Sequence, residues 1–264
     1  MSKEHTNNNP LVTVVTPSYN QGKFIEETIL SVLNQTYKNI QYVVIDGGSN
    51  DETMTVVEKY RDRIDIVVHE RDKGQSDAIN KGFKLATGEL VGWINSDDIL
   101  YPDCVERIVA LYNQKPDGAI YYNCQNDFID KDSKIIQTYK KKIPDKHFLI
   151  NHHYSIIQQG SFYKTNFVKE IGYLDESLHF CMDLDLWLKL LDKGPIYYIN
   201  DNISSTGFRL WGDAKTSTAG SKFQHDILRV LNRNGLNYFS KNHRKLRWQL
   251  MKIYVKKILI PRNS

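Results

Sequence analysis

The chain has 264 residues, which is enough for one large domain or two small ones. Hydrophobic residues make up 41% and charged residues 25%, with a net charge of +4, as is ordinary for a soluble globular protein. The sequence has no apolar run of about 18 residues and begins with the polar stretch MSKEHTNNNP, so neither a transmembrane helix nor a signal peptide is expected. Cys104, Cys124 and Cys181 lack metal-type spacing and indicate reduced thiols in a cytoplasmic protein.

Strands and helices alternate through the first hundred residues. Runs of β-branched and apolar residues predict strands, and apolar residues at helical spacing predict helices, as on the face that Ile25, Ile29 and Val32 share. Near-continuous apolar strands that alternate with helices indicate a parallel sheet covered on both faces, so we expect an α/β fold. The predicted strands are 11–17, 40–46, 64–70 and 90–94, and the predicted helices are 23–35, 52–60 and 76–87.

The pattern loosens after residue 100, and no repeat, low-complexity stretch or linker interrupts the chain before about residue 215. The elements predicted there are helices over 103–114 and 184–194 and strands of a mixed region over 118–130 and 134–140. The expected organisation is a flexible N-terminus over 1–9, one catalytic domain over 10–214 and a helical basic tail over 215–264.

Polar clusters follow each of the four predicted strands, as TPSYN, DGGSND, ERDKGQSD and NSDD. Open sheets of this kind bind ligands beyond the carboxyl ends of their strands. In DGGSND, Gly47 and Gly48 allow close backbone approach, although a plain turn capped by Ser49 or Asn50 explains them equally well. In NSDD, Asp97 and Asp98 repel each other unless solvent or a cation compensates. Divalent cations that carry phosphates often take only one or two protein carboxylates, so we expect a metal and diphosphate site there, with a solvated turn as the alternative.

A further acidic pair, Asp183 and Asp185, lies at the start of the helix in FCMDLDLWLKL. One of the two suits a helix cap or a first-turn anion, and the other suits a general base. Their spacing alone does not distinguish these roles.

Four stretches together resemble the successive motifs of inverting family 2 glycosyltransferases with the GT-A fold. They are TVVTPSYNQGKFIEETILSVLNQTY, YVVIDGGSNDET, ERDKGQSDAINKGFKLATGELVGWINSDD and DLDLWLKL. The resemblance covers about residues 10–200 and implies a mostly parallel central sheet with helices on both faces. It also implies transfer of a hexose-type sugar from a nucleotide-diphosphate sugar, with UDP favoured, to a hydroxyl group of a glycan or lipid-linked saccharide.

The resemblance implies roles for individual residues. Asp98 matches the ligand of a divalent metal, Mn²⁺ or Mg²⁺, while Asp97 matches a ribose or sugar contact and is a second candidate ligand. Asp183 matches the general base of the family, which leaves Asp185 a capping or structural role. The implied contacts to the donor nucleotide are Thr16, Pro17, Tyr19, Asp46, Glu70, Arg71 and Asp72.

Three positions depart from the family pattern. Asn95 stands where many members have an acidic residue, and Met182 stands where many have Glu before the base. Trp211 stands where many members carry a late histidine that helps to hold metal or diphosphate. Arg209 or Lys215 is the alternative contact to the diphosphate.

Residues 152–164 lie between the sheet and the predicted base, and the resemblance places this region beside the acceptor. Gln158, Gln159 and Ser161 are therefore expected to contact sugar hydroxyl groups. A strand with alternating polar residues is the alternative.

The end of the chain is strongly basic. Ten of the 35 Lys and Arg residues lie in 227–264, which contains no Asp or Glu, and the rest of the chain is mildly acidic. Within 241–260, one helical face carries Lys245, Gln249, Lys252 and Lys256, and another carries Leu246, Leu250, Ile253 and Tyr254. This pattern predicts an amphipathic helix on an anionic membrane surface, at the inner face of the cell membrane, which suits a polyprenyl-linked acceptor. The alternative is an apolar stripe that packs on the body or on a second subunit, as in a homodimer.

Other classes of protein fit the sequence less well. The first strand lacks the glycine fingerprint of a dinucleotide dehydrogenase, and SYNQGKF matches poorly the Gly-rich basic loop of a sugar-nucleotide pyrophosphorylase. The pyrophosphorylase-like nucleotidyltransferase and a non-catalytic carbohydrate-binding protein on the same fold remain the alternatives. The body offers no motif that supports nucleic-acid binding, so nucleic acid is not an expected partner.

Overall fold

A computed structural model describes residues 9–212 and 220–259 of the chain. The main sheet of the described residues has seven strands in the order β10-β6-β9-β4-β1-β2-β3. All of its pairings are parallel except those of β9, which runs antiparallel to both β4 and β6. The strands are β1 Val12–Ser18, β2 Ile40–Asp46, β3 Ile66–His69, β4 Leu90–Trp93, β6 Ile120–Asn123, β9 Phe162–Lys164 and β10 Ile196–Ile199. The mainly parallel α/β sheet predicted from the sequence is therefore confirmed.

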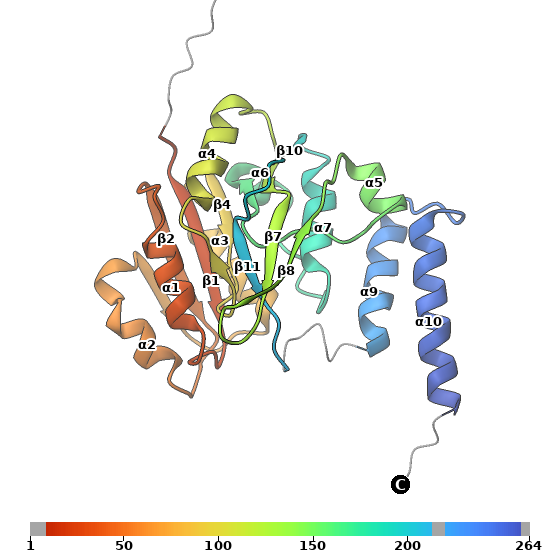
Figure 1. The fold of residues 1–264 in the computed structure, drawn as a ribbon, viewed down its shortest axis with the longest axis horizontal. Coiled ribbons are helices and arrows are strands. Elements are labelled where there is room, and N and C mark those ends of the chain that lie inside the picture. The colour runs from red at the N-terminus through yellow and green to blue at the C-terminus, as the bar shows by residue number, and fades with distance from the viewer. Residues whose placement is uncertain (1–8, 213–219, 260–264) are drawn as a thin grey trace, which may run out of the picture.

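Helices cover both faces of this sheet (Figure 1). All of β1 is buried, and its alternate side chains enter two different cores: Val12 and Val14 enter one, and Val15 the other. The first core is completed by α1 Ile25–Leu33, α2 Thr53–Lys59 and α4 Cys104–Gln114. The second core is completed by α3 Gln75–Leu85, α5 Lys146–Asn151, α6 Thr165–Glu170, α7 Met182–Leu190, α9 Gly220–Arg233 and α10 Lys241–Leu259. A short 3-10 helix, Arg61–Arg63, precedes β3.

A second sheet of four strands, in the order β5-β11-β7-β8, lies beside the main one. Its strands are β5 Ile99–Leu100, β7 Gln125–Ile129, β8 Ile135–Lys140 and β11 Thr206–Arg209. The single strand predicted over 118–130 is therefore two strands, because the chain leaves the main sheet at Cys124 and enters the second sheet. The turn of residues 95–98 connects β4 of the main sheet to β5 of the second, which fixes its place at the junction.

The strand given as the alternative for residues 152–164 is present only at its end, as β9. Residues 153–161 form a loop in which Gln158 and Gln159 are buried. The side chains here are held by hydrogen bonds to other segments and not by a strand ladder; Gln158 Nε2, for example, donates to the backbone carbonyl of Trp93 at 2.8 Å.

At the end of the described chain, α9 and α10 lie side by side (Figure 1). The apolar stripe predicted over 241–260 is used partly for packing, because Leu246 is fully buried and Asn242 Nδ2 donates to the carbonyls of Leu149 and Ile150. Another part faces solvent, since Tyr254 is 68% exposed. Among the described helices, none combines the length and apolar character needed to span a lipid bilayer.

Candidate active site

A cavity of about 810 Å³ opens beyond the carboxyl ends of β1 and β4. It is bounded by the 95–98 turn, the loop of residues 153–161, the start of α7 and the end of β8. The predicted site residues that line it are Pro17, Tyr19, Asp72, Asp97, Gln158, Gln159, Asp183, Arg209 and Trp211. Thr16, Asp46, Glu70, Arg71, Asp98 and Ser161 do not line it, and Lys215 lies outside the described residues. The fold thus brings segments from both ends of the chain to one hollow.

Asp183 lies in the first turn of α7 and lines the cavity. Its Oδ1 accepts a hydrogen bond from the backbone N–H of Leu184 at 2.8 Å. The helix begins after Cys181, whose φ of 52° turns the chain sharply into the helix. Asp185, two residues on, is buried and lies 2.6 Å from the ammonium of Lys189, which agrees with the structural role expected for it.

Asp97 is the member of the acidic pair that lines the cavity. Its Oδ2 accepts a hydrogen bond from the indole Nε1 of Trp211 at 2.9 Å, and the Trp211 ring packs against Phe24 with centroids 5.1 Å apart. Burial raises the pKa of Asp97 above its ordinary value, and the bond from Trp211 opposes that rise. Trp211 occupies the position where the family resemblance leads us to expect a histidine. Its indole N–H supports Asp97, the member of the acidic pair that lines the cavity.

Asp98 is fully buried and does not line the cavity. Its Oδ1 accepts from the backbone N–H of Arg209 at 2.9 Å, and its Oδ2 accepts from Gln159 Nε2 at 3.1 Å and Asn95 Nδ2 at 3.2 Å. Burial, followed by the negative charge of Asp97, raises the pKa of Asp98 to about 8. Both of its oxygens accept hydrogen bonds from protein donors and it does not line the cavity, so Asp98 is the less accessible of the two predicted metal ligands.

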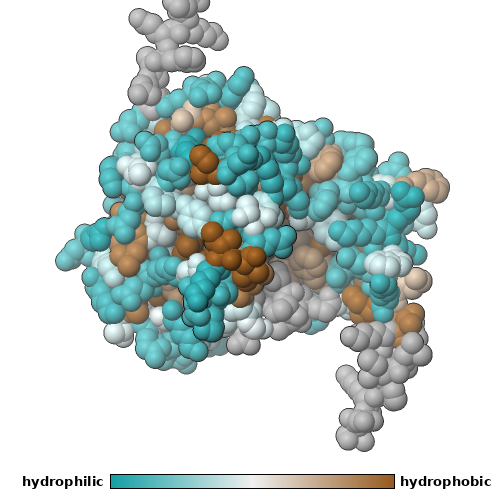
Figure 2. Space-filling view, in the orientation of Figure 1, coloured by the Kyte–Doolittle hydropathy of each residue, from teal (hydrophilic) through white to brown (hydrophobic). Residues whose placement is uncertain are grey.

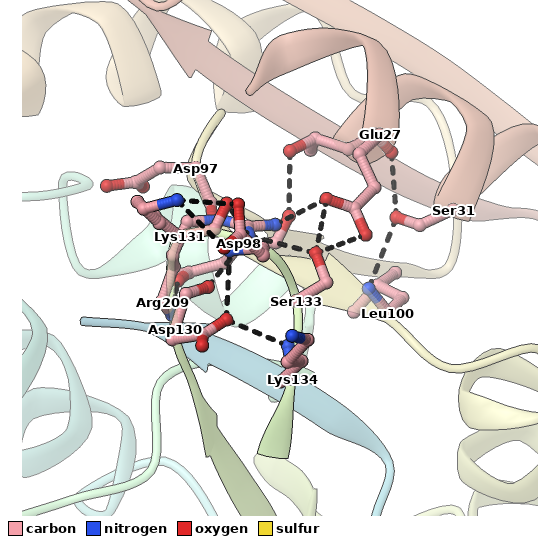
Figure 3. A network of polar contacts seen from close by, with 12 residues as sticks. Glu27, Ser31, Asp97, Asp98, Leu100, Asp130, Lys131, Ser133, Lys134 and Arg209 are labelled. Carbon is pink, nitrogen blue, oxygen red and sulfur yellow. Dashed lines mark hydrogen bonds and ion pairs between the residues drawn. The ribbon is translucent and has the colours of Figure 1, made fainter. Parts of the chain in front are cut away.

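Arg209 is the centre of a polar network beneath the acidic turn (Figure 3). Its Nε donates to the carbonyl of Asp97 at 2.7 Å, and its Nη2 lies 2.6 Å from Glu27 of α1. Its Nη1 donates to the carbonyl of Asp130 at 3.0 Å and to Ser133 Oγ at 2.9 Å. The guanidinium group is fully buried in this network, and the side chain fixes the turn. The contact of Arg209 with a diphosphate stays a prediction.

Two predicted nucleotide contacts also serve the fold. Thr16 is buried, and its hydroxyl shares a hydrogen bond with the hydroxyl of Tyr42 at 3.1 Å. Asp46 is fully buried and accepts from the backbone N–H groups of Gly48 and Ser49, while its Oδ2 lies 2.7 Å from His69 Nδ1. The side chains of these two residues point into the protein and shape the loop after β2.

Three other predicted site residues, Ser161, Arg71 and Glu70, also lie outside the cavity lining. Ser161 donates to the carbonyl of Ile157 and is buried. Arg71 is exposed at the surface beside Gly48, and Glu70 pairs with Lys81 at 2.8 Å.

Gly47 leaves room for the carboxylate of Asp72. A Cβ atom at position 47 would lie 2.3 Å from Asp72 Oδ2, which is far inside contact distance. Asp72 Oδ1 accepts from the backbone N–H of Gly74 at 2.8 Å, so the carboxylate is held over the glycine while it lines the cavity. The glycine of DGGSND is therefore required for the close approach of a neighbouring acidic side chain.

The residues present fit a divalent cation that takes few protein ligands. The described residues contain no group of three His, Cys, Asp or Glu side chains suited to a metal ion. Asp97 nevertheless presents a carboxylate to the cavity, and burial raises its pKa above the ordinary value. Mg²⁺ and Mn²⁺ in phosphate-binding sites are commonly held by one or two carboxylates, with phosphate and water completing the shell.

Sequence reasoning missed the cationic end of the cavity. Lys140 and Lys141, at the end of β8, line it together with Tyr154 and Ser155. The run YKKK at 139–142 was a visible signal. The position of this run beside the cavity depends on the pairing of β8 in the second sheet, and no local sequence pattern predicts that pairing.

Comparison with known proteins agrees with this geometry. A sequence model of Glycosyl transferase family 2 matches residues 13–179. An uncharacterised glycosyltransferase of Rickettsia typhi is 33% identical over 201 residues, which cover 72% of this chain and 61% of that protein. The chain thus spans less than two thirds of the length of this relative.

Two solved structures share the fold. Residues 1–349 of S. aureus TarS in complex with UDP-GlcNAc align with a TM-score of 0.67 at 19% identity, over 92% of this chain and 71% of that chain. The mannosyltransferase PcManGT of Pyrobaculum calidifontis, in complex with GDP-Man and Mn²⁺, aligns with a TM-score of 0.67 at 16% identity, over 96% and 75%. Because the family match covers more than half of the chain, the protein belongs to glycosyl transferase family 2 and has the GT-A fold.

Proposed function

We propose that the protein is an inverting glycosyltransferase that moves a hexose-type sugar from a nucleotide-diphosphate sugar, with UDP favoured, to a hydroxyl group of a glycan or lipid-linked saccharide. The observation that carries this proposal is the single cavity lined both by Asp97 of the acidic turn and by Asp183 of α7. The ligands in the TarS and PcManGT structures, UDP-GlcNAc and GDP-Man, support a donor of this class.

The donor end of the cavity is proposed to lie at the ends of β1 and β4. Pro17 and the half-exposed ring of Tyr19 would contact the nucleoside, and the fixed carboxylate of Asp72 would accept hydrogen bonds from its base or ribose. Asp97, in place of Asp98, is the proposed ligand of Mn²⁺ or Mg²⁺. A bound cation would neutralise negative charge on the diphosphate.

Asp183 is the proposed general base. It takes the proton of the acceptor hydroxyl as that oxygen attacks the anomeric carbon from the face opposite to the diphosphate. The bond from the anomeric carbon to the donor oxygen breaks, and the nucleoside diphosphate leaves with the electron pair, so the configuration inverts. Gln158 and Gln159, which line the cavity, are proposed to orient the acceptor, although the amide of each already donates to Trp93 or Asp98.

Asp183→Asn tests this assignment. General-base assistance contributes about 10²–10⁴-fold, so the variant should lose a factor in this range in sugar transfer while its affinity for UDP is unchanged. Transfer is followed with a panel of UDP-, dTDP- and GDP-sugars and saccharide acceptors, and UDP binding is followed by calorimetry. Normal turnover in the variant would show that Asp183 is not the general base. Release of nucleotide that depends on added pyrophosphate would favour the pyrophosphorylase alternative.

We also propose that α10 brings the protein to an anionic membrane surface. The helix exposes Trp248, Met251, Tyr254 and Val255, and Lys252 lies 3.5 Å from the centroid of the Trp248 ring. Figure 2 shows hydrophobic side chains among hydrophilic ones at the lower end of this helix. Exposed aromatic and basic side chains on one helix are typical of interfacial binding.

Flotation with phosphatidylglycerol vesicles tests this proposal, with phosphatidylcholine vesicles as the control. The triple variant Trp248→Ser, Met251→Ser, Tyr254→Ser should lose flotation with the anionic vesicles. Equal flotation of the variant and the wild type would exclude the proposal. A concentration-dependent dimer that is lost in the same variant would assign the surface to a second subunit instead.

A further inference from the structure

The cavity contains a lysine that has no acidic partner among the described residues. Lys141 lines the cavity, and its Nζ donates to the hydroxyl of Ser155, which lines the cavity as well. Other partly buried lysines are paired: Lys146 and Lys189 lie 2.6 Å from the carboxylates of Asp192 and Asp185. The ammonium of Lys141 therefore faces the cavity without a described counter-charge.

The start of α10 adds positive charge to this end of the cavity. The ammonium of Lys245 lies 4.9 Å from the ring centroid of Tyr154, and Tyr154 lines the cavity. Burial, followed by the positive charge of Lys245, lowers the pKa of Lys141 to about 8. Burial, with the charges of Lys141, Lys245 and Lys241, also lowers the pKa of His153, to about 4. We call Lys141, Lys241 and Lys245 the cationic cluster.

The cationic cluster lies where the cavity lining meets α10. Lys141 donates to Ser155, and the preceding residue, Tyr154, donates its hydroxyl to Gln249 Oε1 of α10 at 3.3 Å. The ammonium of Lys245 lies over the same Tyr154 ring. Asp97 belongs to a different segment of the lining, the turn of residues 95–98, where the donor diphosphate is proposed to bind.

Lys141 is partly buried, whereas Lys241 and Lys245 are exposed. A partly buried ammonium group that lies near other positive charges and has no acidic partner among the described residues costs free energy. A negatively charged ligand group at the same place would reverse that cost, and would gain charge-assisted hydrogen bonds from Lys141 and Ser155. We propose that Lys141, Ser155 and Lys245 form a subsite for an anionic group, a phosphate or a carboxylate, on the acceptor saccharide. This inference rests on the proposed function, since it takes the cavity to hold donor and acceptor together.

Three sugars of similar size test the subsite: glucose, glucuronic acid and glucose 6-phosphate. Each is titrated by calorimetry into the full chain, with and without saturating UDP and Mn²⁺. The wild type should bind at least one of the two anionic sugars about tenfold or more tightly than glucose, which is the gain expected for a hydrogen bond to a charged group. The tighter of the two identifies the anion as phosphate or carboxylate.

The variant Lys141→Met should bind all three sugars with the affinity of glucose, and Lys141→Arg should keep the preference because it keeps the charge. Lys142→Met is the matched control, since Lys142 is exposed, adjacent and outside the cavity lining. Equal affinity of the wild type for the three sugars, or an unchanged preference in Lys141→Met, would overturn the proposal. So would competition between UDP and the anionic sugars, which would assign Lys141 to the donor diphosphate. Failure of UDP to bind would count against the proposed donor. The affinities of the three sugars measured without UDP would still test the anionic subsite.

Discussion

Asp97 and Asp98 are adjacent in the sequence, but the protein treats their carboxylates differently. Asp98 is fully buried and accepts three hydrogen bonds, from Arg209, Gln159 and Asn95. Asp97 faces the cavity with the indole of Trp211 as a donor. The carboxylate of Asp98 therefore supports the turn, and the carboxylate of Asp97 is the one that we propose contacts the donor and its metal ion.

Substitution of each aspartate by asparagine should separate these roles. Asp98→Asn places an amide group opposite protein donors and should cost about 1–3 kcal/mol of unfolding free energy. Asp97→Asn should change that free energy by less than about 1 kcal/mol and should abolish the dependence of UDP-sugar binding on Mn²⁺. Urea unfolding and calorimetry with and without Mn²⁺ measure the two effects. If Asp98→Asn removes the Mn²⁺ dependence of UDP-sugar binding and leaves the unfolding free energy unchanged, then Asp98 is the metal ligand.

The contact between Gly47 and Asp72 gives a second prediction at the residue scale. Gly47→Ala forces the Asp72 carboxylate out of the space it occupies 2.3 Å from the new Cβ, so affinity for UDP should fall about tenfold. Asp72→Ala should cause a similar fall, and the double variant should lose little more than either single variant, because both changes remove one group. Additive losses measured by calorimetry would show that the two residues act independently.

At the scale of the elements, α10 is attached to the body by its first half. Leu246 is fully buried in the second core, and the amide of Asn242 donates to the end of α5. From Trp248 onward the helix carries the exposed side chains Trp248, Met251 and Tyr254. The apolar residues of α10 are thus divided between packing on the body and exposure to solvent, and the exposed ones are those for which we propose membrane binding.

Leu246→Ala tests this attachment. Truncation of a fully buried leucine should lower the unfolding free energy by about 2–5 kcal/mol, because it removes apolar contacts and leaves a cavity. Met251→Ala is the control: Met251 is 57% exposed, so the change should stay within about 0.5 kcal/mol. Urea denaturation of both variants gives the comparison. Equal stabilities would mean that α10 does not pack on the body in solution.

The strands and helices of the first hundred residues were predictable because each buried strand is a continuous apolar run and each helix has a regular apolar face. The antiparallel insertion of β9 between β4 and β6 was not predictable, since three residues carry no local signal for their partners. The buried state of Thr16 and Asp46 was missed for a related reason. A strand that is buried on both faces gives no pattern that tells which side chain reaches a cavity at its end.

At the scale of the whole molecule, the cavity joins segments that are far apart in the sequence, from Pro17 in β1 to Ile227 in α9. A ligand bound there stabilises all of these segments against unfolding together. UDP at 100 times its dissociation constant should raise the unfolding free energy by about 2.7 kcal/mol, and Mn²⁺ should increase the shift further. A thermal-shift series with UDP, dTDP and GDP, each with and without Mn²⁺, measures this. A largest shift with GDP would replace UDP as the favoured nucleotide.

Arg209 is the last residue of β11, yet its side chain and backbone hold the acidic turn at 97–98. During synthesis the whole parallel half of the main sheet, from β1 to β4, leaves the ribosome long before this arginine does. A nascent chain halted before β11 would carry the nucleotide end of the fold but an unfinished acidic turn. Under the proposed function, we expect a fragment that ends before β11 to lack the donor site at the acidic turn, because the hydrogen bonds from Arg209 to Asp97 and Asp98 would be missing.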